Sequence, residues 1–264
     1  MTPTAPAKAS AAGTRPEGVR DEREAAARVR EMFTRIVPRY DFLNHFLSFS
    51  LDRVWRRRAA QEFLAVMRRP DARILDLCCG TGDLAFAMDR AREKALCYAA
   101  GTRRKIVGSD FVTPMVSRAR EKAARGERRV EFAAADALSL PFADGSFDLV
   151  TTAFGFRNLA NYESGLREIA RVLKPGGELG ILECSEPESG MMAGVFRFYF
   201  RRVLPLLGGV ISGSREAYSY LPASVMKFPP PAELAALMGR CGFVDVRVMR
   251  WNFGSVALHA ARRL

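Results

Sequence analysis

Acidic residues and a glycine turn are spaced along the first half of the chain in a way that could hold an adenosine ligand. Asp76 precedes the turn Gly80-Thr81-Gly82, and a helix-forming segment follows at once, over residues 84–95. A buried strand that runs into a glycine turn and a helix is typical of the first βα unit of a nucleotide-binding sheet. Glycine is needed because the backbone bends sharply and a ligand approaches where a Cβ atom would clash. By itself the turn predicts a nucleotide-like ligand and does not exclude a dinucleotide.

The acid before the turn narrows the class of ligand. Asp76 is expected at the carboxyl ends of the strands, facing the ligand crevice. A carboxylate there would repel a pyrophosphate group, whereas it would attract the sulfonium and ammonium groups of S-adenosylmethionine. The alternative is a structural role in which Asp76 caps a backbone amide, and the sequence leaves both roles open.

Two later acids extend this pattern. Asp110 ends a predicted strand and can accept hydrogen bonds from both ribose hydroxyls, a position that NAD enzymes share. Asp136 and Ala137 follow the next strand and can offer a carboxylate and a backbone amide to the adenine edge. A dinucleotide site would leave this third acid without a clear role. Together with the turn, the acids predict S-adenosylmethionine as the cofactor.

The elements that must position these residues alternate regularly. Strands are expected over 73–78, 105–110, 130–134, 147–153 and 178–183, with helices over 84–95, 114–125 and 162–173 between them. Lys174-Pro175-Gly176-Gly177 reads as a helix stop and turn. After Pro229-Pro230-Pro231 we expect a helix to residue 241, then strands over 244–251 and 255–261. The tight turn between these last strands makes them antiparallel.

The predicted fold is therefore a Rossmann-like α/β domain with a mostly parallel seven-stranded sheet that ends in an antiparallel hairpin. Residues 1–18 read as a disordered tail, and 19–264 as one domain. Within it, 19–70 form a helical cap with helices over 19–37 and 51–67, 71–185 the cofactor-binding half, 186–228 a lid insertion, and 229–264 the last helix and hairpin.

The amino-acid composition limits which classes of binding partner the chain could have. The chain has 264 residues, with 41 basic against 29 acidic residues and a net charge of +12. A basic surface suits nucleic acid, anionic lipid or an acidic metabolite, but no basic patch interleaved with aromatic residues favours nucleic acid. Five cysteines without paired spacing and only two histidines predict neither disulfides nor a metal site. We expect a cytoplasmic location, at most peripheral at the inner face of the membrane, and leave a homodimer open.

The chain resembles the ubiquinone/menaquinone biosynthesis C-methyltransferases from about residue 28 to its end. The shared stretches are Phe33, Tyr40-Asp41, Asn44, Trp55-Arg56, Leu75 to Asp83, Asp110-Phe111, Leu140-Pro141-Phe142, Phe154-Gly155-Phe156-Arg157-Asn158-Leu159 and Arg171 to Gly177. The resemblance implies a Class I methyltransferase that uses S-adenosylmethionine to methylate a ring carbon of a prenylated quinol. It favours conversion of demethylmenaquinol to menaquinol, with the methoxy-benzoquinol of the ubiquinone pathway as a second acceptor.

The resemblance also assigns residues. Arg157 and Asn158 follow the strand 147–153, where the acceptor would lie over the methyl group. Arg157 could stabilise a phenolate-like oxygen and assist proton removal through a water, since arginine itself is a poor base. Asn158 and Tyr40 could orient the ring hydroxyls. In the alternative interpretation, Arg157-Asn158 form a turn and a salt bridge.

Two cofactor positions also come from the resemblance. Phe111 follows the ribose acid, and Ala153 stands where relatives often carry a hydroxyl that contacts the cofactor. With alanine at 153, that hydroxyl contact is absent from this chain.

An apolar helical face is predicted late in the chain. Residues 196–207 place Phe196, Tyr199, Phe200, Val203, Leu204 and Leu207 on one helical face. This face could pack on the sheet, cover a prenyl tail, or touch a membrane surface. Two other functions remain as alternatives: methylation of another small molecule or nucleic acid, and a non-catalytic component of the quinone pathway.

Overall fold

A single sheet of seven strands forms the centre of the protein, with strand order β3-β2-β1-β4-β5-β7-β6. The computed structural model describes residue 13 and residues 18–96, 106–126, 128–187, 191–199, 202 and 215–264, so most of the predicted tail lies outside the described residues. The strands are β1 Ile74–Leu77, β2 Ile106–Asp110, β3 Glu131–Ala134, β4 Phe147–Ala153, β5 Leu173–Cys184, β6 Phe243–Trp251 and β7 Val256–Arg263.

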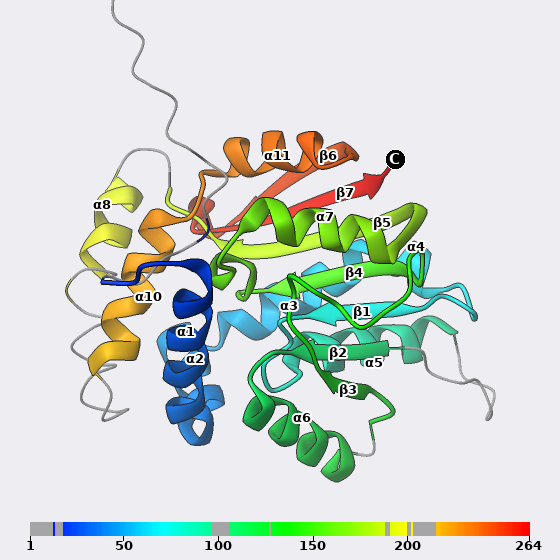
Figure 1. The fold of residues 1–264 in the computed structure, drawn as a ribbon, viewed down its shortest axis with the longest axis horizontal. Helices are drawn as coiled ribbons and strands as arrows, with labels where there is room; N and C mark the ends of the chain where they lie inside the picture. The colour runs from blue at the N-terminus through cyan, green and yellow to red at the C-terminus, as the bar shows by residue number, and fades with distance from the viewer. Residues whose placement is uncertain are drawn as a thin grey trace, which may run out of the picture.

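The pairing of the strands confirms the predicted fold. β1 lies parallel between β2 and β4, and β5 continues the parallel order on the other side of β4. β7 runs antiparallel to both β5 and β6, so the last two strands form the expected hairpin. Because parallel strands share one direction, their carboxyl ends meet at one edge of the sheet, as Figure 1 shows.

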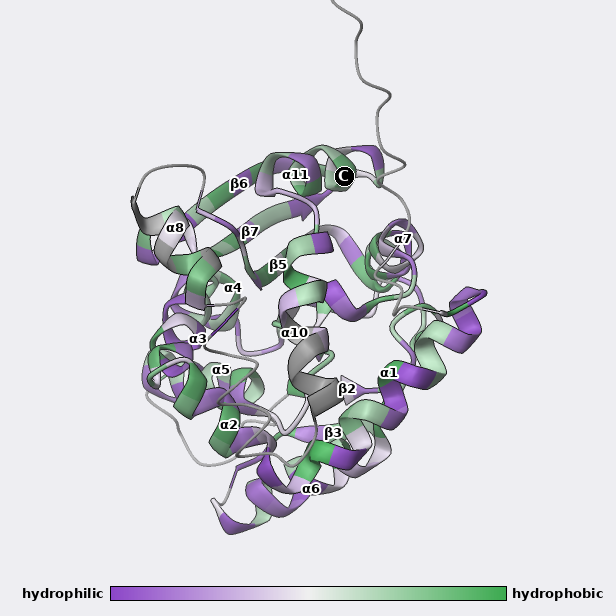
Figure 2. Ribbon diagram, turned by 90° about the vertical axis from the view of Figure 1, so that its left-hand side faces the viewer, coloured by the Kyte–Doolittle hydropathy of each residue, from purple (hydrophilic) through white to green (hydrophobic). Residues whose placement is uncertain are grey.

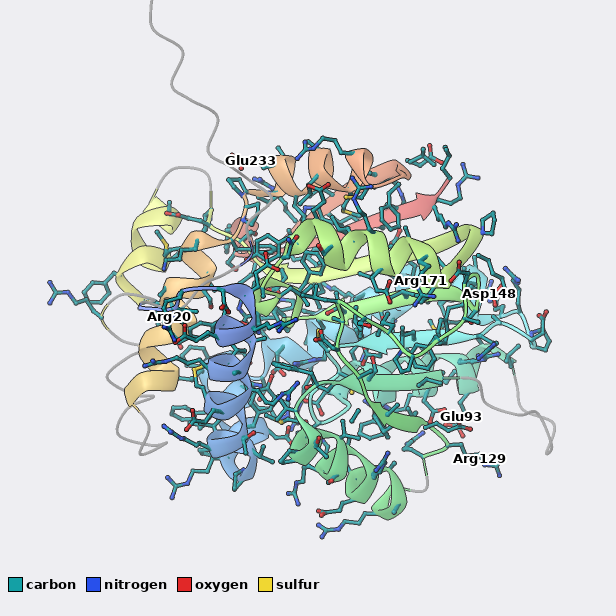
Figure 3. The ribbon with its side chains drawn as sticks, in the orientation of Figure 1. Arg20, Glu93, Arg129, Asp148, Arg171 and Glu233 are labelled. Atoms are coloured by element: carbon teal, nitrogen blue, oxygen red, sulfur yellow. The ribbon has the colours of Figure 1, made fainter. Side chains whose placement is uncertain are left out.

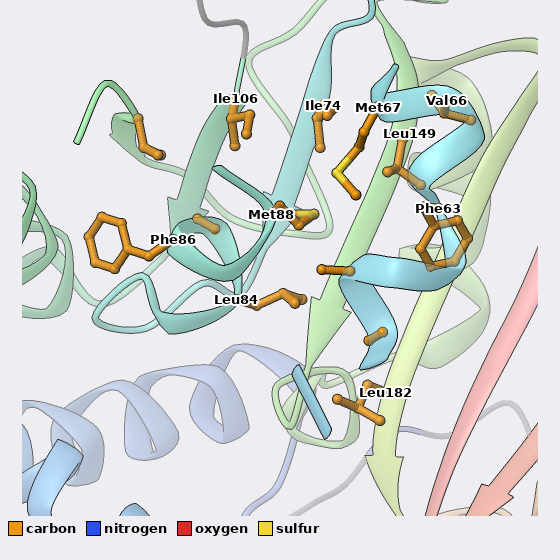
Figure 4. Close-up of a cluster of buried hydrophobic side chains, with 14 of the residues drawn as sticks. Phe63, Val66, Met67, Ile74, Leu84, Phe86, Met88, Ile106, Leu149 and Leu182 are labelled. Carbon is orange, nitrogen blue, oxygen red and sulfur yellow. The ribbon is translucent and has the colours of Figure 1, made fainter. Parts of the chain in front are cut away.

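Helices cover both faces of the sheet. On one face lie α3 Leu51–Glu62, α4 Leu64–Met67, α5 Asp83–Leu96 and α6 Thr113–Arg125; on the other lie α7 Tyr162–Val172 and α11 Pro231–Arg240. Figure 4 shows the cluster on the first face, where Phe63 and Met67 approach Ile74, Leu149 and Met88. Burial on both faces explains why β1 is apolar except for Asp76.

A third group of helices stands at the carboxyl ends of the parallel strands. It comprises α1 Glu22–Ile36, a 3₁₀ turn at Val37–Arg39, α2 Tyr40–Leu47, α8 Met191–Phe198 and α10 Arg215–Lys227. Figure 2 looks onto this side of the molecule. Met32, Leu43, Phe196 and Val225 come from four of these helices and share one small core. This core fixes α1 and α2 in front of the strand ends.

The expected helix over 51–67 is interrupted once. α3 ends at Glu62 and α4 begins at Leu64, with Phe63 between them. Phe63 is buried, and its ring fills the space beside Gly180, where a Cβ atom would lie 2.6 Å from it. The break is therefore a packing feature of the sheet face.

The helix stop predicted at Lys174 to Gly177 is confirmed, since α7 ends at Val172, but the predicted turn is wrong. Lys174-Pro175-Gly176-Gly177 lies inside β5, which begins at Leu173. Phe147 pairs with Leu173 and Leu149 with Glu178, so these four residues form a bulge instead of a free turn. The helix predicted over 19–37 is α1, which ends at Ile36; Pro38 then occupies the first turn of the 3₁₀ segment, where its missing N–H is not needed, and α2 follows.

The late apolar face is described only in part. Phe196 is buried in the small core with α1 and α2, whereas Phe198 of α8 is exposed. Phe200, Val203, Leu204 and Leu207 lie outside the described residues. Among the described helices, none is both long enough and apolar enough to cross a bilayer.

Candidate active site

Three adjoining cavities lie at the carboxyl ends of the strands, and Tyr40 borders all of them. The large cavity measures about 460 Å³, the middle cavity about 60 Å³ and the small cavity about 10 Å³. The large and middle cavities share the walls formed by Phe33 and Phe154, and the large and small cavities share Arg56. The predicted site residues come to these cavities from β1, β2, β4 and the helices in front of them.

The small cavity contains the acid that precedes the glycine turn. Asp76 is fully buried, and its Oδ2 accepts a hydrogen bond of 2.9 Å from the backbone N–H of Ala85 in α5. Its carboxylate also borders the cavity, beside Asp83. Asp76 therefore fills both predicted positions: it caps a backbone amide of α5 and it lines a cavity. Burial raises the pKa of Asp76 to about 8, so a cationic ligand group would favour its charged form.

The turn itself is built from left-handed backbone. Gly80 has φ +54° and Gly82 has φ +90°. A Cβ atom on Gly82 would lie 2.9 Å from the Phe132 ring, so glycine is required there for packing. Thr81 is buried and donates its hydroxyl to Asp41 of α2, which ties the turn to the helical cap. Gly82 is absent from the walls of the three cavities, whereas Gly80 and Thr81 border them.

The middle cavity brings together the acids that follow β2 and β3. Asp110 accepts hydrogen bonds from the backbone N–H groups of Gly80, at 2.8 Å, and Val112, at 2.9 Å. It is 7% exposed and burial raises its pKa. Asp136 and Ala137 line the same cavity. Asp110, the last residue of β2, thereby ties β2 to the glycine turn that follows the neighbouring strand β1.

The remaining two cofactor candidates lie at the edges of these cavities. Phe111 borders the middle cavity, and the Arg30 guanidinium stands 5.2 Å from its ring centroid. Ala153, the last residue of β4, borders the small cavity. Each predicted cofactor residue except Gly82 therefore lines the middle or the small cavity.

Arg157 contributes a permanently charged wall to the large cavity. Its Nη1 donates to Glu183 Oε2 at 2.9 Å, and its backbone N–H donates to Glu183 Oε1 at 3.1 Å. Burial would lower the pKa of Arg157, but the Glu183 carboxylate outweighs it and raises the pKa above its usual value. Arg157 Nε is buried without a hydrogen-bond partner. This side chain is held as a cation, and it cannot act as a base.

Asn158 lies on the other side of the same 3₁₀ turn, Phe156–Asn158. It borders the middle cavity, and its side-chain oxygen accepts a hydrogen bond of 3.1 Å from the Tyr220 hydroxyl of α10. Tyr40 stands between the two cavities. The three residues predicted to bind the acceptor therefore lie near the boundary between the large and middle cavities. Tyr40 borders both cavities, Arg157 borders the large one and Asn158 the middle one.

Several residues at the site were not singled out from the sequence. Arg56 borders the large and small cavities, and its guanidinium lies 5.2 Å from the Phe154 ring centroid. Asp52 borders the large cavity and pairs with Arg56. For Arg56 the one signal was its place in the Trp55-Arg56 motif. For Glu183 it was an acid at the end of an apolar strand.

One group of side chains has the spacing of a cation site. The ligand atoms of His45, Asp52 and Asp83 lie within 4.8 Å of one another. Both carboxylates already have cationic partners in the protein: Arg56 pairs with Asp52, and Lys122 Nζ lies 2.7 Å from Asp83. The group is therefore an ion-pair network.

Comparison with solved structures shows to which class of fold the chain belongs. A solved structure of a SAM-dependent methyltransferase from Thermotoga maritima is 18% identical, covers 89% of this chain and 99% of its own, and superposes with a TM-score of 0.60. At this identity the likeness shows the fold alone. The chain therefore has the fold of a Class I methyltransferase, with acid-lined cavities at the carboxyl ends of its strands.

The ubiE/COQ5 methyltransferase family matches residues 20–263, and the chain belongs to this family. The demethylmenaquinone methyltransferase of Thermus thermophilus is 50% identical over 88% of this chain and 100% of its own length. The ubiquinone/menaquinone biosynthesis C-methyltransferase of Geobacter sulfurreducens is 41% identical over 91% of this chain and 90% of its own. The family resemblance and the cofactor inferred from the sequence are confirmed.

Proposed function

We propose that this enzyme transfers a methyl group from S-adenosylmethionine to a ring carbon of demethylmenaquinol, giving menaquinol. The observation that carries the proposal is the large cavity of about 460 Å³ beside the two acid-lined cavities. Many of its walls are apolar side chains, among them Ile36 of α1, Leu47 of α2 and Phe196 of α8, which suits a prenylated ring. The Thermus thermophilus relative, named for demethylmenaquinone, supports this acceptor, and the Geobacter sulfurreducens relative supports the ubiquinone-pathway quinol as a second one.

The cofactor would be held by residues of the two smaller cavities. Asp110 would accept the ribose hydroxyls, Asp136 and Ala137 would meet the adenine edge, and Asp76 would face the ammonium group. Arg56 is the one basic side chain among the described walls of the small cavity, and we assign it the methionine carboxylate. Bound S-adenosylmethionine supplies an electrophilic methyl group.

The acceptor ring would lie where the large cavity meets Tyr40. The Arg157 cation would stabilise negative charge on a ring oxygen, because Glu183 keeps its guanidinium fixed and charged. Tyr40 and Asn158 would orient the ring hydroxyls. Holding ring and methyl group in attack geometry gives an effective molarity of roughly 10⁵ M or more.

We further propose that the enzyme meets its lipid-like substrate at a membrane surface. Exposed Phe49 and Phe253 border the large cavity, and Leu51 borders it beside them. The exposed Arg53 and Arg57 of α3 add positive charge near this rim. In this proposal α1 and α2 cap the site, and α8 and α10 act as a lid. A homodimer stays a prediction, to be tested by light scattering.

The test is an assay of the purified enzyme with S-adenosylmethionine and a short-chain demethylmenaquinol kept reduced. We expect S-adenosylhomocysteine and methylated quinol in equal amounts, and a mass shift confined to the ring. A deletion strain should accumulate desmethyl quinone, and Arg157→Ala should fail to restore the methylated form. Turnover of demethylmenaquinol by Arg157→Ala at the wild-type rate would contradict the acceptor-site assignment. Cofactor binding without turnover of either quinol would favour another acceptor.

A further inference from the structure

The methylated ring carbon must lose its hydrogen as a proton, so the large cavity needs a proton acceptor. The titratable side chains among its described walls are Tyr40, Asp52, Arg56, Arg157, Cys184, Tyr199 and Tyr220. Arg56 and Arg157 are cations with no lone pair to offer. A side-chain acceptor among these described walls must be one of the other five.

Four of these five hold their own proton at neutral pH. Burial raises the pKa of Tyr40 and of Tyr199, and it raises the pKa of Cys184 and of Tyr220 to about 12 each. Such groups donate hydrogen bonds and do not accept a proton from carbon. Asp52 is left as the one ionised acceptor among the described walls of this cavity.

Asp52 is fixed in place by three neighbours. It is 3% exposed, on the first turn of α3. Oδ1 accepts a hydrogen bond of 2.7 Å from the Ser48 hydroxyl, and Oδ2 lies 2.8 Å from His45 Nδ1 and also accepts from Arg56. Burial alone would raise the pKa of Asp52, but the charge of Arg56 and the hydrogen bonds from Ser48 and His45 lower it. The carboxylate is therefore ionised and oriented before any ligand arrives.

The position of Asp52 also suits a role as the proton acceptor. Its partner Arg56 borders both the large and the small cavity, so the Asp52–Arg56 pair stands where the acceptor cavity meets the cofactor side. Arg157 approaches the large cavity from a different element, the turn after β4. A ring held between them would have a cation for its oxygen and a carboxylate for its hydrogen.

We propose that Asp52 is the catalytic base that removes the ring proton after methyl transfer, while His45 and Ser48 position it. The ring C–H bond breaks, its electron pair restores the aromatic ring, and the proton forms an O–H bond on the Asp52 carboxyl. The inference rests on the proposed ring methylation. Because the side chain of His45 is 18% exposed, it connects Asp52 to solvent, where the proton is finally released.

The first test uses Asp52→Asn, which keeps the shape of the side chain. With saturating cofactor, we expect kcat to fall about 10²-fold or more. The isotope effect on kcat with ring-deuterated demethylmenaquinol should become larger than in the wild type, since proton removal becomes limiting. A kcat near the wild-type value, or a lower kcat with an unchanged isotope effect, would show that Asp52 only positions Arg56. If the wild type does not turn over the quinol at all, the proposed function itself fails.

The second test separates base loss from misfolding. Asp52→Ala leaves space beside Ser48 and His45, and added formate should restore part of its turnover. Arg157→Ala is the matched control, because a small carboxylate cannot replace a missing cation and no rescue is expected. Calorimetry with S-adenosylhomocysteine checks that both variants still bind the cofactor. A folded, cofactor-binding Asp52→Ala enzyme that formate does not rescue would overturn the proposal.

Discussion

At the scale of single residues, the site is dominated by buried charges whose partners differ. Arg157 is neutralised inside the protein by Glu183, and Asp52 is neutralised by Arg56. Asp76 accepts hydrogen bonds from the Ala85 N–H and from Thr151, and the charge of Arg56 also favours its ionised form, but burial outweighs these effects. A buried carboxylate is costly to ionise. Asp76 therefore depends on a positively charged ligand to become charged.

This difference predicts a pH dependence of cofactor binding. The pKa of Asp76 lies near 8 in the free protein, so near neutral pH the carboxyl is largely protonated and must lose its proton to meet an ammonium group. Affinity for S-adenosylhomocysteine should fall as the pH drops below 8. Calorimetry in buffers of different ionisation enthalpy should show more proton release for the wild type than for Asp76→Asn.

The same variant should also bind more weakly. Loss of one charge-assisted hydrogen bond costs about 1.5–3 kcal/mol, or roughly 10- to 100-fold in affinity. Methylthioadenosine, which lacks the amino-acid group, serves as the control ligand and should bind the two proteins alike. Equal proton release by wild type and Asp76→Asn would disprove the role given to Asp76.

At the scale of elements, a feature could be predicted from the sequence when neighbouring residues determine it, and could not when distant strands or helices do. β4, Phe147–Ala153, has the predicted bounds because a short run rich in apolar and β-branched residues, bounded by turn residues, identifies a buried strand. Asp76, Asp110 and Asp136 could be found since each comes at or just after a strand end. The bulge at Lys174–Gly177 depends on pairing with β4, which lies outside the local sequence. Likewise, Asp52 reaches the site only through the packing of α3 against the sheet.

Asp148 illustrates an element-scale ion pair far from the site. It lies near the start of β4 and, in Figure 3, at the far end of the sheet from α8 and α10. Its carboxylate accepts from the Arg73 N–H at 2.9 Å, Lys174 Nζ at 2.8 Å and Arg69 Nη2 at 2.7 Å. Burial alone would raise the pKa of Asp148, but the Lys174 and Arg73 hydrogen bonds and the nearby charges lower it.

Asp148→Asn should therefore reduce the free energy of unfolding by about 1–2 kcal/mol at neutral pH. A carboxyl whose pKa is lowered by folding stabilises the protein above its unfolded pKa, near 3.9, and this stabilisation is lost as the pH falls below it. The difference between the two proteins in urea unfolding should shrink accordingly. Asp144→Asn is the control, since Asp144 is 80% exposed in its pair with Arg171. A larger effect of Asp144→Asn would contradict this prediction.

At the scale of the whole molecule, exposed aromatic side chains border the large cavity. Phe49 and Phe253 are each 78% exposed, although they come from segments far apart in sequence. Phe42 and Phe46 are also exposed and stack on each other along α2. Exposed aromatic residues gathered beside an apolar cavity are typical of an interaction surface.

Replacing Phe49 and Phe253 together by serine should weaken binding to vesicles that contain anionic lipid by tenfold or more, because each buried aromatic ring contributes roughly 1.5–3 kcal/mol. Co-sedimentation measures this directly, and the melting temperature should hardly change. Leu264→Ser is the control, since Leu264 is 80% exposed at the chain end that Figure 1 shows on the opposite side. Equal binding by both variants would exclude this surface as the membrane contact.

Tyr40 gives the three cavities one shared wall. Its ring lies 3.5 Å from the place of a Cβ on Gly80 and edge-on to Phe33, so a displacement of α2 changes donor and acceptor spaces together. We expect the two proposed ligand sites to be thermodynamically coupled through this side chain. An occupant of the quinol space that moves Tyr40 would alter cofactor affinity, and the cofactor would alter quinol affinity by the same factor. Release of either ligand would then depend on whether the other is bound.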